Sequence, residues 1–360
     1  MTRAWVEIDL GALLHNGARA ASHTGVPLLP MVKADAYGLG AVHVARALES
    51  LDPWGFGVAT VAEGAELRAA AVTRPIVVFT PLLAEDFDAA CRARLTPTLG
   101  DADLVRRWSA TGLPWHLAID TGMNRAGAPW DAVGRLRDVV AECPPQGVFT
   151  HFHSAEKDDG SRQVQEERFA RALAELPARP ALVHAENSPA LARRSHGGAR
   201  TWTLARPGIF LYGVGSGGGA EIAPEPVVSL RARVVDVRCV EAGESVSYGA
   251  TYRAEGRRRI ATLAIGYADG YRRALSNAGA ALVRGRRAPV TGLVTMDMTM
   301  VDVTDVPCEV GDVATLLGAD GKERLDVAAV AEAAALSPYE LLTGLRSRLP
   351  RRFLGAAPRS

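Results

Sequence analysis

The chain has 360 residues, 48% of them hydrophobic and 22% charged, and its formal net charge is +1. This composition is typical of a globular protein that is long enough for one large α/β barrel or for two domains. Because a nearly neutral chain is not attracted to nucleic acid or to anionic membranes, we expect neither as a partner.

The termini and the cysteines predict where the protein works. The first residues, MTRAWVEIDL, lack the apolar core of a signal peptide. No apolar run reaches the roughly 18 residues that a membrane span needs. The four cysteines lie far apart and form no CxxC pair, which favours reduced thiols and no zinc site. We therefore expect a cytoplasmic protein without a bound metal.

The first part of the chain has a repeating pattern. Residues Trp5–Leu10 alternate like a short strand and Gly11–Ala21 are helical in pattern. Short β-branched or aromatic runs then alternate with helical stretches rich in Ala, Leu, Glu and Arg. The predicted strands of this repeat are Leu28–Lys33, Trp54–Thr60, Ile76–Pro81, Leu95–Leu99, Trp115–Asp120, Gly147–Phe152, Ala181–Glu186 and Ala205–Tyr212.

Strands that alternate with helices pair in parallel through right-handed crossovers, and eight of them close a (β/α)8 TIM-type barrel. We expect this barrel over residues 11–220. A doubly wound open sheet is the alternative, since a count of strands does not prove closure. No GxGxxG follows the first strand, so the dinucleotide-binding fingerprint is missing.

A glycine-rich link, VGSGGG at residues 214–219, precedes a change of pattern. Short strands joined by Gly, Pro and Asp turns follow, and two helices are predicted at Asp326–Leu336 and Pro338–Ser347, the second opened by a Ser337–Glu340 capping box. Residues 221–360, joined by residues 1–10, are expected to form a mostly-β domain. Its predicted strands are Val227–Val240, Ser245–Tyr252, Arg259–Ile265, Ala281–Arg284, Pro289–Thr291, Met298–Val303 and Asp312–Leu317.

Polar residues gather at the C-terminal ends of the predicted barrel strands, where barrel enzymes carry their active sites. They are Lys33, Thr60, Thr80, Asp120, His151, Asn187 with Ser188, and Arg206. Lys33 is suited to amine chemistry, because a neutral lysine amine attacks a carbonyl and holds it as a Schiff base, as with pyridoxal phosphate. The alternative is a surface lysine after an edge strand.

The loops after strands seven and eight, with Ser188, Gly208 and Ile209, offer a hydroxyl and backbone N–H groups to a phosphate. An ordinary N-cap at Ser188 is the alternative. Arg206 keeps its proton, so it would leave a cofactor ring nitrogen beside it unprotonated; otherwise it is a salt-bridged strand arginine. These residues together with Lys33 favour pyridoxal phosphate.

Other polar motifs leave more than one interpretation open. The turn at Asp120–Gly122 would present Arg125 to a phenolate or a carboxylate. His151 and His153 lie two residues apart on one face of a strand and would suit a metal-dependent hydrolase. In the β domain, Tyr267 is equally a half-buried core residue and Asp297 a turn former.

Taken together, eight segments resemble the alanine racemase family of fold-type III pyridoxal phosphate enzymes. They follow the family order from residue 5 to about 350: MVKADAYGLG, IDTGMNRAG, THFHSAE, HAENS, ARPGIFLYG, VSYGATY, IGYADGY and TMDMTM. The resemblance implies a barrel, a C-terminal β domain and a homodimer in which the β domain contributes to the partner subunit's active site. It implies racemisation of L- and D-alanine, which supplies D-alanine for peptidoglycan.

The resemblance also assigns roles to residues. Lys33 would be the Schiff-base lysine and one acid/base, and Tyr267 the second base, acting in the partner's site. His151 and Arg206 would form the hydrogen-bonded chain that activates this tyrosine. The residues that would bind the phosphate are Tyr37, Ser188, Gly208 and Ile209. Arg125 and the Met296 N–H would bind the substrate carboxylate, and Asp297 would support the site.

The chain departs from the family pattern at four positions. Ala118 stands where many members have a carbamylated lysine that positions the arginine, so Arg125 needs another partner. Ser347 replaces a tyrosine at the phosphate site, Leu293 an arginine of the entry corridor, and Glu156 an aspartate there. These positions bear on substrate range, so a broader-specificity small amino-acid racemase is an alternative.

A non-catalytic pyridoxal phosphate carrier is a further alternative function, though such proteins lack a β domain. A fold-type III decarboxylase would need an acidic partner for the ring nitrogen in place of Arg206.

Overall fold

The computed structural model describes residues 2–193 and 202–355 of the chain. These residues form two compact units. One unit contains residues up to Ala12, Tyr37–Leu39 and the residues from Pro226 onward; the other contains Leu13–Ala36 and Gly40–Glu225. Within the two described stretches, no helix has the length and apolar character to cross a membrane.

The helices are mostly short, and the longest have 15 residues. They are α1 (Leu10–Thr24), α2 (Lys33–Gly38), α3 (Ala41–Leu48), α4 (Val61–Ala69), α5 (Phe87–Arg92), α6 (Ala102–Ser109), α7 (Arg137–Glu142), α8 (Ser161–Glu175), α9 (Ser188–Ala192), α10 (Val327–Ala333) and α11 (Pro338–Thr343).

The strands fall into two groups along the chain. The earlier strands are β1 (Ala4–Asp9), β2 (Phe56–Val58), β3 (Ile76–Val78), β4 (Thr96–Leu99), β5 (His116–Asp120), β6 (Ala128–Pro129), β7 (Gly147–Phe149) and β8 (Leu182–His184). The later strands are β9 (Val228–Val240), β10 (Ser245–Val246), β11 (Tyr252–Arg253), β12 (Arg258–Leu263), β13 (Ala280–Val283), β14 (Arg286–Pro289), β15 (Thr299–Asp302), β16 (Val313–Asp320), β17 (Glu323–Leu325) and β18 (Arg351–Leu354).

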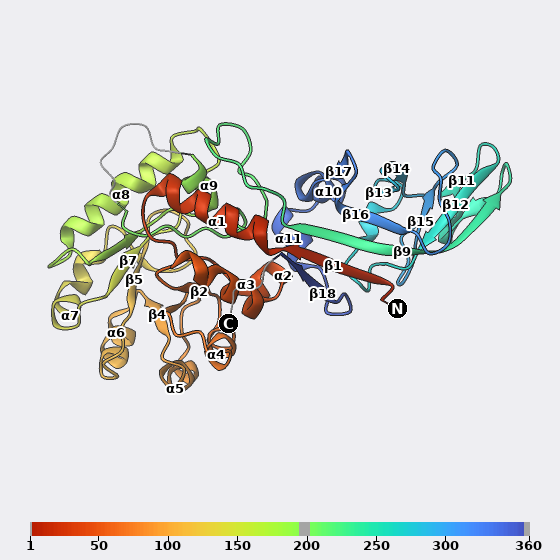
Figure 1. Ribbon diagram of the computed structural model, residues 1–360. Coiled ribbons are helices and arrows are strands. Elements are labelled where there is room, and N and C mark those ends of the chain that lie inside the picture. Colours follow the sequence, from red (N-terminus) through yellow and green to blue (C-terminus); the bar gives the residue numbers. More distant parts are fainter. Residues whose placement is uncertain (1, 194–201, 356–360) are drawn as a thin grey trace. The chain divides into compact units, whose positions relative to one another are not determined.

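The unit that carries Lys33 is built on a parallel sheet of order β2-β3-β4-β5-β7-β8, with β6 beside β5. Its strands are almost wholly buried, as expected for a sheet covered on both faces; β2, β3 and β7 are apolar throughout, whereas β4 contains two threonines and β5 a histidine and an aspartate. Helices α4, α5, α6 and α7 lie outside these strands (Figure 1). The parallel β/α pattern predicted from the sequence is therefore confirmed.

Backbone hydrogen bonds close this sheet into a barrel. The N–H of Arg206 donates to the carbonyl of Glu186 after β8, at 2.8 Å. On its other side the same segment receives the N–H of Leu29, which donates to the carbonyl of Ala205 at 2.7 Å. Residue Val32 then donates to the carbonyl of Gly57 in β2, at 2.8 Å. The ring of parallel contacts is complete, which excludes the open doubly wound sheet.

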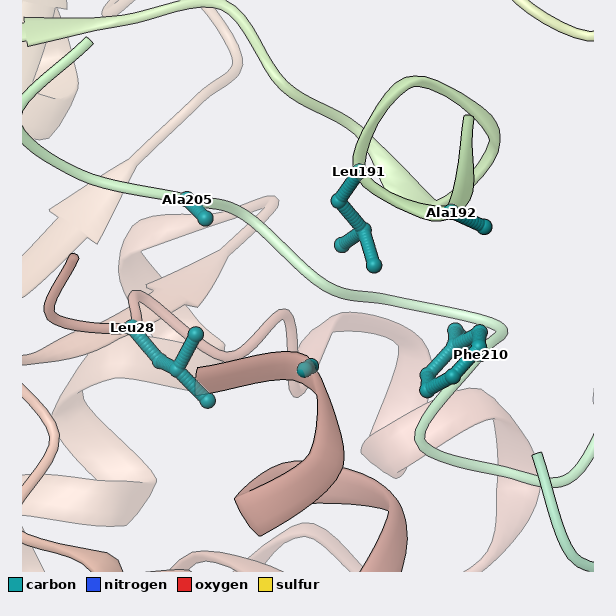
Figure 2. Packing of buried hydrophobic residues seen from close by; sticks show 6 residues of the cluster. Leu28, Leu191, Ala192, Ala205 and Phe210 are labelled. Atoms are coloured by element: carbon teal, nitrogen blue, oxygen red, sulfur yellow. The ribbon is translucent and has the colours of Figure 1, made fainter. Parts of the chain in front are cut away.

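A buried apolar cluster packs behind the closure. It contains Leu28, Leu191, Ala205 and Phe210, each at most 3% exposed. Figure 2 shows Leu28, Leu191 and Phe210 turned toward a common space, with Ala205 on the segment beside them. The cluster joins α9 to the first and last segments of the barrel, so apolar burial reinforces the few hydrogen bonds there.

The other unit contains a sheet of order β14-β13-β16-β9-β1-β18. Strand β9 alternates between buried and more exposed residues over most of its length, which is typical of a sheet with one packed face. The N-terminal strand β1 pairs in parallel with β18 and antiparallel with β9. Two helices of this unit, α10 and α11, begin where the sequence predicts, and Ser337 and Glu340 form the predicted capping box.

Three predicted strands are wrong. Leu28–Lys33 and Ala205–Tyr212 make only isolated bridges, Leu28 to Ala205 and Met31 to Gly57, and residues 209–213 form turns. Ser245–Tyr252 is interrupted between β10 and β11, because Ser247, Gly249 and Ala250 have positive φ angles of 68°, 69° and 47°. Strands β6, β17 and β18 were not predicted, and the predicted strand Pro289–Thr291 begins where β14 (Arg286–Pro289) ends.

Candidate active site

Lys33 begins a left-handed turn at the C-terminal end of the first barrel segment. The next four residues, Ala34 to Tyr37, have φ between 52° and 59°, and none of them is glycine. Left-handed backbone costs a residue with a side chain about 1–2 kcal/mol, so the four together cost on the order of 4–8 kcal/mol. The turn is held by the Ala36 N–H on the Val32 carbonyl and by the Ala41 N–H on Asp35 Oδ1, at 2.8 Å and 2.7 Å. Strain of this size is maintained where surrounding contacts fix the backbone, and it is typical of functional sites.

Cationic groups gather around this lysine. Burial lowers the pKa of Lys33, and the charges of Arg125 and Arg206 lower it further. The pKa of His151 lies well below its usual value because of burial and then the charges of Arg206, Arg125 and Lys33. Burial also lowers the pKa of Arg206, to about 9, which still leaves this guanidinium protonated near neutral pH. The mouth of the barrel is therefore positively charged and suited to anionic ligands.

Arg206 is fixed by polar groups at the C-terminal ends of two barrel strands, β7 and β8. It is 2% exposed and its Nη2 donates to the carbonyl oxygens of Thr150 and Ala185, at 2.8 Å and 3.1 Å. The same nitrogen lies 3.2 Å from His151 Nδ1, and Nη1 lies 2.8 Å from His184 Nδ1. The guanidinium carbon also lies 5.3 Å from the centre of the Phe149 ring. Arg206 is thus a buried residue that binds carbonyl and imidazole groups, and the charge of Glu186 opposes the lowering of its pKa.

These contacts assign the tautomers of three histidines. A guanidinium only donates, so His151 and His184 accept at Nδ1 and carry their hydrogens on Nε2. The Nε2 of His184 lies 3.0 Å from His116 Nδ1, so His184 donates and His116 also carries its hydrogen on Nε2. Burial lowers the pKa of His116 to about 3 and that of His184 well below its usual value. The buried row His116, His184 and Arg206 therefore holds one positive charge, on the arginine.

The loop that carries Arg125 is anchored from helix α8. Thr121 Oγ1 lies 2.7 Å from Thr150 Oγ1 and receives Gln165 Nε2 at 3.1 Å. Gln165 also donates to the His151 carbonyl, at 3.1 Å. Asp120 Oδ1 accepts the Gly122 N–H at 2.8 Å, which forms the predicted turn. Arg125 itself is exposed, and Ala118 is a buried residue of β5.

Ser188 lies where the sequence predicts a phosphate-binding hydroxyl, and its own hydrogen bonds orient it. Its Oγ accepts the N–H groups of Gly208 and Phe210, at 2.8 Å and 3.2 Å. Because two donors occupy the two lone pairs, the hydroxyl hydrogen is directed to a further acceptor. The N-cap of α9 is Asn187, whose Oδ1 accepts the Ala190 N–H, so the interpretation of Ser188 as the N-cap is wrong. The predicted Gly208 N–H already has a protein acceptor, and Ile209 adjoins it.

In the other unit, Tyr267 and Met296 lie on two hydrogen-bonded loops. The Tyr267 N–H donates to the Thr295 carbonyl at 2.9 Å, and the Ala268 N–H to the Met296 carbonyl at 3.0 Å. The side chain of Tyr267 is 39% exposed and that of Met296 is 53% exposed. Gly266 allows this close approach, because a methyl group there would overlap the carbonyl oxygens of Thr295 and Met296. Tyr267 is thus not a core residue.

An ion-pair network fastens the same two loops. Arg348 lies 2.8 Å from Asp297 Oδ1 and 3.3 Å from Asp269 Oδ1. Asp269 is buried, and its other oxygen accepts the Gly266 N–H at 3.0 Å. Asp297 therefore has a partner and is more than a turn former.

Tyr37 belongs to the same unit and is buried. The centre of its ring lies 6.0 Å from that of Tyr339. Burial raises the pKa of Tyr37, and Tyr339 raises it further.

The structure thus brings together many of the predicted groups, and it adds others. Lys33, Arg125, His151 and Arg206 influence one another electrostatically on the barrel unit. Four residues that shape the site were not predicted from the sequence: His116, Gln165, Arg348 and Glu63. A signal existed only for Glu63, since Thr60-Val61-Ala62-Glu63 has the spacing of a capping box. Within the described residues no group of three or more His, Cys, Asp or Glu side chains is placed to hold a metal, and His153 lies 2.8 Å from Ser154 Oγ.

The barrel is closed and has an amine and an arginine at its mouth, and a β-sheet unit follows it along the chain. These features are those of a two-domain barrel enzyme with an amine-bearing site. Two family models match the chain: the alanine racemase N-terminal domain over residues 8–216 and the alanine racemase C-terminal domain over residues 227–353. The chain belongs to the alanine racemase family.

Individual relatives resemble the chain over nearly its whole length. The alanine racemase of Citrifermentans bemidjiense is 38% identical over 97% of this chain and 98% of its own. The crystal structure of the alanine racemase from E. faecalis is 31% identical and superimposes with a TM-score of 0.91, over 98% of each chain. That of Bartonella henselae, which contains covalently bound pyridoxal phosphate, is 28% identical with a TM-score of 0.89, over 98% of this chain and 100% of its own.

Proposed function

We propose that this protein is a pyridoxal 5′-phosphate-dependent alanine racemase that interconverts L- and D-alanine with two bases, Lys33 and Tyr267. The observation that carries the proposal is the grouping of Lys33, His151 and Arg206 at one barrel mouth, where Arg206 is held by four polar contacts. Membership in the alanine racemase family over nearly the whole chain supports it.

The residues of the mouth fit this cofactor. Lys33 provides the amine for its aldehyde, and the cationic surroundings lower the pKa of that amine and so increase its neutral, nucleophilic fraction. Two backbone N–H groups occupy the lone pairs of Ser188 Oγ, so the hydroxyl can only donate to a further group. A phosphate oxygen is a suitable acceptor for that hydrogen. Ile209 and Tyr37 complete the proposed phosphate site, and Gly208 contributes by donating its N–H to Ser188 Oγ and so orienting that hydroxyl.

When bound, the cofactor supplies an electron-withdrawing ring that makes the α hydrogen of an attached amino acid acidic. Arg206 would limit this effect on a ring nitrogen bound against it, because a protonated guanidinium has no acceptor for a hydrogen and does not give one up near neutral pH. A short-lived carbanion character is sufficient for racemisation. The same feature disfavours the decarboxylase, which would need an acidic residue in place of Arg206.

Inversion at the α carbon requires two bases on opposite faces. Lys33 removes or returns the proton on one face, and Tyr267 of a second copy does so on the other. His151 carries its hydrogen on Nε2, because Arg206 donates to its Nδ1 at 3.2 Å. A neutral imidazole with that hydrogen stabilises an ionised phenol by donating to it, which makes the tyrosine a competent base. The homodimer with shared sites is part of this proposal.

The substrate carboxylate is assigned to Arg125 and to the backbone N–H of Met296, with Asp297 as support. Arg125 is exposed and acts on the pKa of Lys33 and His151, so its charge reaches the site. Asp297 is paired with Arg348, which holds the Met296 loop against the Tyr267 loop. Ala118 leaves Arg125 without the side-chain partner found in many members, and this departure favours, as a second candidate, a racemase of broader specificity for small amino acids.

We place the reaction in the cytoplasm, where the product D-alanine would enter peptidoglycan synthesis. Free thiols at all four cysteines agree with a reducing compartment.

The test compares racemisation with exchange of the α hydrogen in deuterated water. Tyr267→Phe should slow racemisation by about 10²–10⁴-fold in both directions, since the overall equilibrium constant links them. Lys33 remains, so the variant should still exchange the α hydrogen of one enantiomer but no longer that of the other. Tyr248→Phe is the control, because Tyr248 is an exposed tyrosine of the same unit. Exchange of both enantiomers at the wild-type rate by Tyr267→Phe would exclude the two-base assignment.

A further inference from the structure

Glu63 joins two segments of the barrel mouth through a single carboxylate. Its Oε1 accepts the N–H of Ala34 at 2.9 Å, and its Oε2 accepts the N–H of Ala59 at 2.7 Å. Ala34 is the residue that follows Lys33 and the first of the left-handed turn. The carboxylate thus fixes the amide next to the proposed cofactor lysine.

Capping of helix α4 does not account for this arrangement. Glu63 and Thr60 form a capping box, in which Thr60 Oγ1 accepts the Glu63 N–H at 3.3 Å. The returning bond of the box, from the Thr60 N–H to Glu63 Oε2, is long at 3.4 Å. The shorter bonds of the carboxylate go to Ala59 and to Ala34, which is 29 residues away in sequence. A cap alone needs neither of these.

The position of Glu63 also affects the charge of the lysine. Burial, Arg125 and Arg206 lower the pKa of Lys33, and Glu63 opposes them by raising it. A strained turn needs a contact that holds it in place, and a charge-assisted bond to its first amide is such a contact.

We propose that Glu63 is a positioning residue for Lys33: by binding the Ala34 amide it holds the left-handed turn and directs the lysine amine toward the cofactor aldehyde. This inference rests on the proposed function of Lys33. The reaction it assists is a condensation, in which the amine nitrogen adds to the aldehyde carbon, one water leaves, and no electrons are exchanged with another reagent.

The experiment measures attachment of pyridoxal phosphate to the cofactor-free full-length protein. The rate is followed by visible absorbance, and the attached lysine is identified by borohydride reduction and peptide mass spectrometry. Glu63→Ala should slow attachment at Lys33 by about 10-fold or more, because a hydrogen bond to a charged group is lost. Glu63→Gln keeps the size but offers one acceptor oxygen to two amides, so we expect a smaller but clear decrease.

Thr60→Ala is the matched control, since it removes the Thr60 side of the capping box and leaves the bonds from Ala34 and Ala59 in place. It should lower the thermal unfolding midpoint yet attach the cofactor at the wild-type rate. The inference would be overturned if Glu63→Gln attached the cofactor at the wild-type rate, or if Thr60→Ala slowed attachment as much as Glu63→Ala does. If Glu63→Ala does not fold, the rate measured for Glu63→Gln is the test. A wild-type protein that is labelled at a residue other than Lys33 would refute the proposed function itself.

Discussion

The buried histidines make the stability of the protein depend on pH in a calculable way. His116, His151 and His184 are neutral in the folded protein because burial lowers their pKa values, to about 3 for His116. In the unfolded chain each imidazole returns to a pKa of about 6.5. Below that pH the unfolded state binds more protons than the folded state, so stability that is fully present above about pH 6.5 is lost as the pH falls.

The magnitude follows from the shift. At about pH 5.5, protonation of the unfolded His116 alone lowers the free energy of unfolding by about 1.4 kcal/mol relative to neutral pH. His151 and His184 change the stability in the same direction, so the loss for the wild-type protein exceeds that of His116 alone, against the roughly 5–15 kcal/mol that a folded protein typically has.

Urea unfolding at about pH 7 and about pH 5.5 measures this loss. His116→Leu should be less stable than wild type at both pH values, because His184 loses its acceptor. Its loss between the two pH values should nevertheless be smaller by about 1.4 kcal/mol, since one titrating imidazole is gone. Equal losses in His116→Leu and wild type would refute the assignment of His116 as a neutral buried residue.

Two further substitutions test the two loops of the site. Ser188→Ala leaves the Gly208 and Phe210 N–H groups without their acceptor. We therefore expect the unfolding free energy to fall by about 1–3 kcal/mol and pyridoxal phosphate to be released faster in dialysis. Unchanged cofactor retention would argue against a phosphate site at Ser188. Gly266→Ala forces the Tyr267 loop away from the Thr295 and Met296 carbonyls. Racemisation should therefore slow, and the unfolding free energy should drop by about 1–3 kcal/mol. Gly256→Ala is the control and should behave as wild type, because a methyl group at Gly256 meets nothing within 4 Å.

The alternation of strands and helices in the barrel unit could be predicted from apolar runs, because each buried strand such as β3 is a continuous apolar segment. The ends of the ring could not. The segments at Leu28 and Ala205 are as apolar as the strands, yet the first leads into a left-handed turn and the second contains Pro207. Proline has no N–H to donate to a ladder, and this shortens the pairing.

The left-handed turn after Lys33 had no signal in the sequence. Ala34, Ala36 and Tyr37 have no intrinsic preference for positive φ, so the conformation is imposed by contacts distant in sequence, among them Glu63. The same holds for the interruption of Ser245–Tyr252, where Ser247 and Ala250 adopt positive φ within a β-rich pattern. Tertiary contacts override local propensity at these positions.

The site residues divide in a similar way. Lys33 and Arg206 could be found because strand ends of a barrel form the mouth. The row from His116 to Arg206 could not, because His116 and His184 lie 68 residues apart. Only the pairing of β5 with β7 and of β7 with β8 brings His116 Nδ1 to 3.0 Å from His184 Nε2. Arg348 was missed for the same reason, since it connects loops that are 28 residues apart.

The most direct test of the two-base site is complementation between two inactive variants. Lys33→Ala and Tyr267→Phe chains are unfolded together, refolded as a mixture, and assayed for racemisation of L-alanine. If each site takes Lys33 from one chain and Tyr267 from the other, half of the sites in every mixed dimer are intact, and random pairing should restore about a quarter of the wild-type activity. A mixture no more active than its two parents, with mixed dimers shown to form, would contradict the shared site.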